Sequence, residues 1–274
     1  MSLDSTILVL GGTGTVGSRV VARLRDAGRD VRAVSRHTSP RFDWADPGTW
    51  EGVLAGVPVM FVLLPDQTAM PEAFLPAALR AGVRRVVLHS DRGLEVMGLD
   101  HLRKAEQDVR DSGAEWTIVR PDWFHQDFET FFRQPVVDGR LCVPVGDAAQ
   151  GFIDADDIAA VEVAALTGDD LLGELVEVTG PRALSFGAAV AEIGAATGRE
   201  ITFDGTPGAY RETMRADGLP DEVIEALISG FGRLAARGDT KPTGVVEQIL
   251  KRPGRDFTDY VADAAARDVW SRAR

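Results

Sequence analysis

The sequence of 274 residues contains a single cysteine, Cys142, so the chain cannot form an internal disulfide bond. It contains no run of about 18 apolar residues, which excludes a transmembrane helix of ordinary length. The N-terminal residues Met1–Ser5 lack the basic and then apolar pattern of a secretory signal. These absences predict a cytoplasmic protein that has no membrane partner.

Basic residues are fewer than acidic ones. Lys and Arg together number 30, against 42 Asp and Glu, and the formal net charge is −12 at pH 7. A charge of this sign repels a phosphate backbone, so nucleic acids are not expected among the partners. Hydrophobic residues make up 45% of the sequence, which is enough for a substantial core.

Apolar segments of strand length alternate with amphipathic segments through the first half of the chain. Strands are expected at residues 6–10, 31–35, 57–64, 83–90 and 115–120, with helices in the stretches between them. Val16, Val20 and Leu24 recur at a helical spacing, which places them on one face of the first helix. The alternation predicts right-handed βαβ units and hence an α/β, doubly wound parallel sheet of the Rossmann type.

The pattern loosens after Pro121. Helices are expected at 157–167, 185–197, 222–227, 244–250 and 256–266, and strands at 175–179 and 201–204. We therefore predict a dinucleotide-binding domain over residues 1–150, to which later strands return. A smaller, mainly helical C-terminal lobe on the substrate side is expected over residues 151–274.

The first predicted strand runs into a glycine-rich turn with the sequence G-G-T-G-T-V-G at 11–17. Gly11 permits the tight turn, Gly14 lets the backbone approach a pyrophosphate, and Gly17 lets the helix pack closely on the sheet. Backbone N–H groups at the start of the helix would face the phosphates, aided by the helix dipole. This segment predicts a dinucleotide site made by Gly11, Thr13, Gly14, Thr15, Val16 and Gly17.

The end of the second predicted strand indicates which dinucleotide binds. An acidic residue there bonds the ribose 2′-hydroxyl of NAD, whereas an arginine pairs with the 2′-phosphate of NADP. The sequence at 31–37 is V-R-A-V-S-R-H, so Ser35 and Arg36 stand where an acidic residue would be. Guanidinium pairs well with phosphate, and Ser35 can donate a further hydrogen bond, which predicts NADP (NADPH) as the cofactor. The alternative is that Arg36 is an ordinary surface arginine.

Five segments of the sequence are informative as a set. They are G-G-T-G-T-V-G at 11–17, F-D-W-A-D-P at 42–47, V-V-L-H-S at 86–90, K-A-E-Q-D-V-R-D-S-G-A-E-W-T-I-V-R-P at 104–121 and F-I-D-A-D-D-I-A at 152–159. Together they resemble the NmrA-like, atypical short-chain dehydrogenase/reductase family, which includes NAD(P)H-dependent quinone reductases and NADP-sensing regulators. The resemblance covers nearly the whole chain and leaves the substrate unspecified.

The resemblance also implies where the rest of the cofactor lies. One matching segment lies against the adenine, the loop after the third strand lines the pyrophosphate and nicotinamide ribose, and a third loop closes over the nicotinamide. In that order, the matching residues are Asp43 and Trp44, then Leu63, Leu64 and Pro65, then Pro121, Trp123 and Phe124. Structural alternatives are a turn for Asp43, core packing for the leucines, and a join between the lobes for the two aromatic residues.

Short-chain reductases of the ordinary type use a serine and a Tyr-x-x-x-Lys motif, in which the tyrosine donates a proton to the developing alkoxide. Here Ser90 ends the fourth strand and Lys104 matches the lysine, but Asp100 occupies the tyrosine position. The only tyrosines, Tyr210 and Tyr260, are distant in sequence. We expect Ser90 and Lys104 to serve catalysis or cofactor binding without the usual tyrosine.

A histidine can donate a proton near neutral pH. His101 neighbours the tyrosine position, although it is turned about 100° away on the helix. His89 precedes Ser90 in a strand, so its side chain should point to the opposite face. We keep His101 as a candidate proton donor, with a surface or packing role as the alternative, and His125 could also face the cleft.

The acidic cluster of Asp154, Asp156 and Asp157 resembles a metal site. No His, Cys or second carboxylate cluster has a compatible spacing, so we predict no metal. Capping of the helix that begins near Ile158, and compensation of its dipole, explains the cluster instead.

These features predict an enzyme that transfers hydride from NADPH to a small aromatic, quinone-like or carbonyl substrate. Trp123, Phe124, Phe128 and Phe131 would supply the apolar surface for it. A non-enzymatic NADP(H) sensor is the alternative, and so is an epimerase or dehydratase of a specialised metabolite, because one fold hosts many chemistries. The oligomeric state stays open between a monomer and a homodimer.

Overall fold

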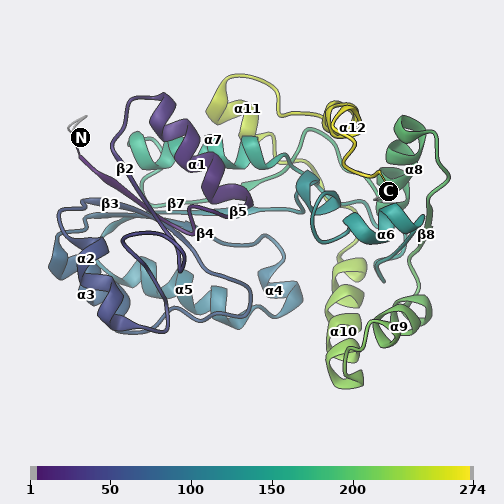
Figure 1. The fold of residues 1–274 in the computed structure, drawn as a ribbon, viewed down its shortest axis with the longest axis horizontal. Helices are drawn as coiled ribbons and strands as arrows, with labels where there is room; N and C mark the ends of the chain where they lie inside the picture. The colour runs from purple at the N-terminus through teal and green to yellow at the C-terminus, as the bar shows by residue number, and fades with distance from the viewer. Residues whose placement is uncertain (1–4, 272–274) are drawn as a thin grey trace.

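Figure 1 shows the computed structural model of the protein, which describes residues 5–271. Its centre is a six-stranded sheet in the order β2-β1-β3-β4-β5-β7, and every pairing within it is parallel. The strands are β1 (Ile7–Leu10), β2 (Val31–Val34), β3 (Val59–Leu63), β4 (Arg85–His89), β5 (Glu115–Pro121) and β7 (Glu174–Val178). The predicted α/β, doubly wound parallel sheet is confirmed.

Helices cover both faces of this sheet (Figure 1). One face carries α1 (Thr15–Asp26), α7 (Ala155–Thr167) and α11 (Val245–Leu250). The other face carries α2 (Trp50–Leu54), which follows the 3₁₀ turn η1 (Pro47–Thr49), together with α3 (Phe74–Ala81) and α5 (Asp100–Asp111). Val16, Val20 and Leu24 are buried, as their spacing in α1 predicts. All four residues of β1 are buried because helices lie above and below it.

The strand order reverses between β1 and β3, since β2 lies on one side of β1 and β3 on the other. Ligands of doubly wound sheets bind outside the carboxyl ends of the strands at this point. The carboxyl edge of the sheet, formed by the residues that follow β1, β3, β4 and β5, is therefore where a site is sought.

A smaller part of the molecule lies beyond that edge (Figure 1). It contains the 3₁₀ turn η2 (His125–Phe128), α6 (Arg133–Asp138), β6 (Arg140–Cys142), α8 (Phe186–Thr197), β8 (Thr202–Asp204), α9 (Pro207–Ala216), α10 (Asp221–Arg237) and α12 (Phe257–Ala266). β6 and β8 form a separate parallel pair. Phe128, Phe186 and Phe257 belong to the apolar cluster at the centre of this part. Between the elements of this part, the chain returns to the main sheet to form α7 and β7.

Helix α10 is longer than the predicted segment at 222–227. Its buried residues Ile224, Phe231 and Leu234 continue one apolar face past Gly230. A Cβ at Gly230 would lie 3.1 Å from Cε of Met97, in the short helix α4 (Leu94–Met97). The glycine therefore allows close contact between α10 and α4, although its type suggested a break in the helix. Among residues 5–271, no helix is both long and apolar enough to cross a lipid bilayer.

Candidate functional site

The glycine-rich turn leaves β1 in a conformation that side chains would block. Gly11 has φ +78°, in the left-handed region, and its N–H donates to the carbonyl of Val34 at the end of β2. A Cβ at Gly17 would lie 2.2 Å from the carbonyl oxygen of Gly11. A Cβ at Gly12 would lie 2.9 Å from Cβ of Ala33. Because these Cβ atoms are absent, the start of α1 can lie close to the first two strands.

The N-terminus of α1 fits a phosphate group. Its N-cap residue, Gly14, offers no side chain to the first N–H groups, and the first turn carries no acidic residue. A Cβ at Gly14 would meet only the Gly11 carbonyl, at 3.5 Å, so space is open beside it. Such free N–H groups and the helix dipole favour an anion. Val16 is buried, so only its backbone can contribute, whereas Thr13 is exposed and Thr15 is half-buried.

Arg36 lies just beyond the end of β2 and beside this turn in the strand order. Its side chain is exposed and makes no ion pair or hydrogen bond with any residue in the described range 5–271. Ser35 orders the local turn, because its Oγ accepts a hydrogen bond from the N–H of His37 at 3.2 Å. The arrangement leaves a guanidinium free at the strand end, where a 2′-phosphate would lie.

The loop that was expected near the adenine is held by its own contacts. The Asp43 carboxylate accepts from Arg41 at 2.6 Å and from the N–H of Ala45 at 3.1 Å. The ring of Trp44 packs edge-on against Phe42 and Phe74, with ring centroids 4.9 and 4.8 Å apart. Asp43 thus organises a turn and Trp44 joins the core. Contact with an adenine stays a prediction for both.

Some of the residues at the ends of β3 and β5 lie at the carboxyl edge of the sheet, and others are buried in the core. Leu63 lies beside the glycine turn, since its Cβ is 3.5 Å from the position of a Cβ at Gly11. Leu64 is buried in the core, and Pro65 is exposed. After β5, the half-buried Phe124 stays at the sheet and the half-buried Trp123 turns to the smaller part. The ring contacts of Trp123 are with Phe132, Phe186 and Phe231.

Ser90 belongs to a buried polar network that crosses from β4 to α5 and β5. Its Oγ donates to Oε1 of Glu106 at 2.6 Å. Arg120 donates through Nε and Nη2 to the two oxygens of the same carboxylate, at 2.7 Å each. Burial opposes ionisation of Glu106, but the hydrogen bonds from Arg120 and Ser90 outweigh it, and its pKa is lowered. Pro121, which follows Arg120, is buried. Sequence reasoning missed this network, although both charged members lie within the segment 104–121.

Lys104 faces away from Ser90, on the outer side of α5. Its Nζ lies 2.9 Å from Oδ2 of Asp108 and 3.6 Å from Oε1 of Glu72. With those two carboxylates it lines a groove of about 390 Å³ that also includes residues of α3. The structure therefore does not join Lys104 and Ser90 through a hydrogen bond. His101 is half-buried and has no hydrogen-bond partner among residues 5–271.

The comparisons with known proteins agree with this geometry. A family model described as NAD(P)H-binding matches residues 11–169. The NAD(P)H azoreductase of Xenophilus azovorans is 32% identical over 95% of this chain and 98% of its own length. An NADPH complex of an NADPH-dependent quinone oxidoreductase from Escherichia coli superposes with a TM-score of 0.83 at 18% identity, covering 94% of this chain and 99% of the other. A mutant NmrA superposes with a TM-score of 0.72 at 17% identity, covering 96% and 95%.

The chain belongs to the NAD(P)H-binding family that this model describes, and it shares its fold with NmrA. It is an NAD(P)H-dependent reductase. The resemblance stated from the five sequence segments is thereby confirmed. In this reductase the two tyrosines lie far from α5: Tyr210 packs against Phe231 of α10, and Tyr260 packs against Phe257 and Trp270. Asp100, at the tyrosine position, is exposed and pairs with Arg103 at 2.6 Å.

His89 and its neighbour Ser90 point to opposite faces of the sheet, as alternation along a strand requires. The Nδ1 of His89 lies 2.6 Å from Oε1 of Glu162 in α7, and this carboxylate is fully buried. Sequence reasoning missed the partner. A signal existed, because Glu162 shares the buried face of α7 with Ile158 and Val161, where a charged residue is unexpected.

Three further aromatic or histidine positions differ from expectation. His125 was considered for the cleft, but it is fully buried and its Nε2 lies 3.1 Å from the carbonyl of Phe152. Phe128 was expected at the substrate, but the turn η2 places it inside the smaller part. Phe131 is 74% exposed and packs on Phe132. These residues therefore do not line the carboxyl edge as a group.

Two carboxyl groups near the edge are held in a partly apolar setting. Burial raises the pKa of Asp91, which follows Ser90, to about 6. Burial likewise raises the pKa of Asp127, in η2, to about 7, and the nearby Asp91 and Asp66 add to the effect. Oδ2 of Asp127 accepts a hydrogen bond from the N–H of Phe124 at 2.9 Å, so this carboxyl fixes the loop after β5.

The acidic cluster at the start of α7 has the structural role predicted for it. Asp154 is the N-cap and its side chain accepts from the N–H of Asp156 at 2.8 Å. Arg255 pairs with Asp154, and Arg252 pairs with Asp157. The carboxylates are thus neutralised by helix N–H groups and by arginines.

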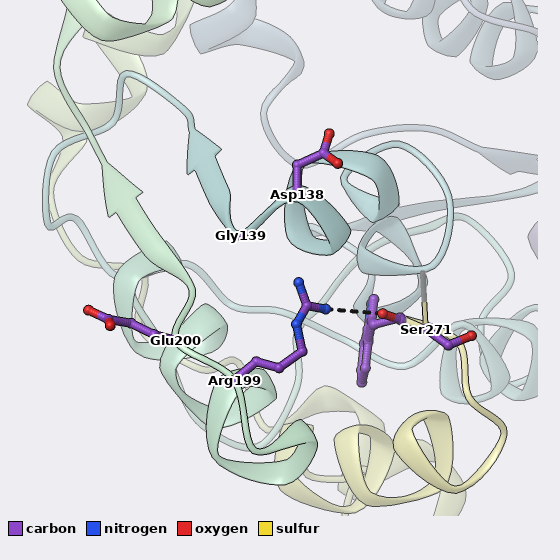
Figure 2. A pocket seen from close by; sticks show the side chains of 6 residues that line it. Asp138, Gly139, Arg199, Glu200 and Ser271 are labelled. Atoms are coloured by element: carbon purple, nitrogen blue, oxygen red, sulfur yellow. Dashed lines mark hydrogen bonds between the residues drawn. The ribbon is translucent and has the colours of Figure 1, made fainter. Parts of the chain in front are cut away.

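A separate cavity of about 520 Å³ lies within the smaller part, and Figure 2 shows its lining. Its lining residues are Asp138, Gly139, Arg199, Glu200, Trp270 and Ser271. The Arg199 guanidinium donates to the carbonyl of Trp270 at 3.1 Å and to the last carbonyls of α6. Arg199 therefore links α6 to the backbone near Trp270 through hydrogen bonds. None of the glycine-turn residues lines this cavity.

Proposed function

We propose that this reductase uses NADPH in preference to NADH and reduces a small aromatic acceptor with a quinone, azo or carbonyl group at the carboxyl edge of the sheet. The observation that carries the proposal is the uncapped N-terminus of α1 beside an exposed Arg36 that has no partner in the described range. The N–H groups fit the diphosphate, and the guanidinium fits the additional phosphate of NADP.

A bound nicotinamide supplies two electrons and a hydrogen as a hydride equivalent. This chain holds the diphosphate through the backbone of residues 11–17 and the adenosine phosphate through Arg36. Leu63 and Phe124 supply apolar surface at the edge where the nicotinamide would lie. The Ser90 hydroxyl is engaged by Glu106 at 2.6 Å, so we assign Ser90 to positioning of the loop after β4.

The substrate class has two supports. One relative is named an azoreductase, and one structural neighbour is named a quinone oxidoreductase. Azo and quinone acceptors are conjugated and electron-poor. The site lacks a tyrosine on α5, and such acceptors draw electrons strongly enough to need less acid assistance than a simple ketone.

The test is to incubate the protein with NADPH and follow the absorbance of the reduced nicotinamide with a panel of quinones, azo dyes and aromatic ketones. Turnover with any of them supports the reductase. Tight binding of NADPH without turnover across the panel favours a sensor of the NADPH/NADP⁺ ratio. Ser90→Ala and Lys104→Ala then test the two predicted catalytic positions, and the geometry leads us to expect the larger loss from Ser90→Ala.

Replacement of Arg36 with alanine should weaken NADPH binding by about 10- to 100-fold, the equivalent of about 1.5–3 kcal/mol for a charge-assisted contact. NADH binding should change little, because NADH lacks the phosphate that the guanidinium contacts. Calorimetric titration with both dinucleotides measures the two affinities. Arg80→Ala, in which an exposed arginine of α3 is removed, is the control for the change in net charge. An equal loss for both dinucleotides would contradict the 2′-phosphate role.

A further inference from the structure

His89 and Glu162 form a buried acid–base pair at the carboxyl edge that the proposed function does not yet use. His89 is the last residue of β4 and lies in register with Leu63 of β3. Leu63 in turn lies against Gly11 of the glycine turn. The imidazole is therefore two strands away from that turn, at the same edge of the sheet.

The two ring nitrogens of His89 have different surroundings. Nδ1 is held by Oε1 of Glu162 at 2.6 Å. Nε2 has no hydrogen-bond partner in residues 5–271. It is not buried, so solvent reaches it. The side chain as a whole is 12% exposed. One nitrogen is thus anchored by a carboxylate while the other is open to a ligand, which is how a histidine is oriented for proton transfer.

Aromatic side chains fix the plane of this ring. Phe61 of β3 and Phe124 of the loop after β5 lie edge-on to it, with ring centroids 6.4 and 5.9 Å away. Phe124 belongs to the loop that should close over the nicotinamide. An acceptor bound beside Phe124 would therefore also be near the open nitrogen of His89.

The charges that face the pair are few. The carboxyl groups near His89 are those of Glu162 in α7 and Asp91 in the loop after β4. The side chains that face it from β3 and from the loop after β5 are the uncharged Phe61 and Phe124. Burial raises the pKa of the Glu162 carboxyl, and its second oxygen has no partner among the described residues. Burial thus favours the neutral form of the Glu162 carboxyl, whose O–H would donate to Nδ1. The single proton of a neutral imidazole then lies on Nε2.

We propose that His89 is the proton donor of this reductase, that it donates from Nε2, and that Glu162 is the positioning residue that holds it. The inference rests on the proposed function, which supplies the hydride. For an azo acceptor, the N=N π bond breaks, one nitrogen receives the hydride, and the other receives the proton from Nε2. The N–H bond of His89 supplies no electrons, because its electron pair stays on Nε2. A water molecule at the edge then returns the proton. A quinone or carbonyl oxygen takes the proton in the same way.

The experiment compares wild-type protein with His89→Gln, using an acceptor that the panel identifies, and measures kcat against pH. We expect His89→Gln to lower kcat by about 100-fold or more, which is the usual contribution of a positioned acid. Its affinity for NADPH should be unchanged, which also shows that the variant is folded. Glu162→Ala should lower kcat, because Nδ1 loses its anchor, and Glu162→Gln should recover part of the loss, because its side-chain amide can still reach Nδ1. His37→Gln, which removes an exposed imidazole beyond β2, is the matched control and should keep the wild-type kcat at saturating NADPH.

A second readout does not depend on turnover. The ¹⁵N chemical shifts of the four histidine rings report which nitrogen carries a proton, and the His89→Gln spectrum assigns the signal. We expect Nε2 to carry the ring proton in the active protein. A bare Nε2 in the active range would overturn the proposal. Normal turnover by His89→Gln, with an active wild type, would do the same while leaving the proposed function intact. Wild-type protein that turns over no acceptor would instead defeat both.

Discussion

Gly17→Ala should abolish measurable binding of NADPH and destabilise the protein by about 1–3 kcal/mol, the usual cost of adding a methyl group to a closely packed site. The new Cβ would lie 2.2 Å from the carbonyl oxygen of Gly11 and 2.8 Å from its carbonyl carbon. Both atoms are backbone, so no side chain can rotate away to relieve the contact. Either α1 moves off the sheet or the turn opens, and each change displaces the N–H groups that fit the diphosphate.

Two measurements separate the expected effects of Gly17→Ala. Calorimetric titration with NADPH reports the affinity, and urea unfolding reports the free energy of unfolding. Gly52→Ala is the matched control, because a Cβ there meets nothing within 4 Å and α2 lies away from the turn. Alanine also suits a helix better than glycine, so the control should be neutral or slightly more stable. Wild-type affinity in Gly17→Ala would show that the turn does not hold the cofactor.

Glu106→Ala should destabilise the protein by about 3–5 kcal/mol, the range found when one partner of a buried ion pair is removed. Glu106 is 1% exposed and takes hydrogen bonds from Ser90 and from two nitrogens of Arg120. Without the carboxylate, the Ser90 hydroxyl and an 11% exposed guanidinium lose their shared acceptor. Glu95 and Glu177 also lie within 3.0 and 4.0 Å of Arg120, and they offset part of the loss.

The same network predicts how stability depends on pH. The pKa of Glu106 is lower in the folded protein than its ordinary value of 4.5. A carboxyl group of this kind contributes stability above its unfolded pKa, and the contribution is lost as the pH falls through the folded pKa. The difference in unfolding free energy between wild type and Glu106→Gln should therefore shrink below about pH 4.5. Urea unfolding at pH 7 and at lower pH measures it.

Asp100→Ala is the control for Glu106→Ala, since it removes a carboxylate of the same helix that is exposed and paired with Arg103. An exposed pair contributes little, so the change should stay within about 0.5 kcal/mol at either pH. If Glu106→Ala were as mild as Asp100→Ala, the buried network would not be a determinant of stability.

Local chemistry made part of this protein predictable from the sequence. The glycine turn could be predicted because the reasons for each glycine, a left-handed φ at Gly11 and a missing Cβ at Gly17, act over a few residues. The parallel sheet followed from apolar runs alternating with helical periodicity, and the cap at Asp154 followed from its place before α7. The exposed Arg36 was likewise placed correctly at the end of β2.

Side-chain partners in the site were decided only by the tertiary structure. His89 and Glu162 are separated by 73 residues and meet only because α7 packs over the sheet at β4. The same holds for Ser90 and Glu106, and for the placement of Lys104 on the outer side of α5. Sequence periodicity tells which face of an element is buried, but the register and crossing of packed elements determine which two residues touch. That information comes from packing of the whole chain.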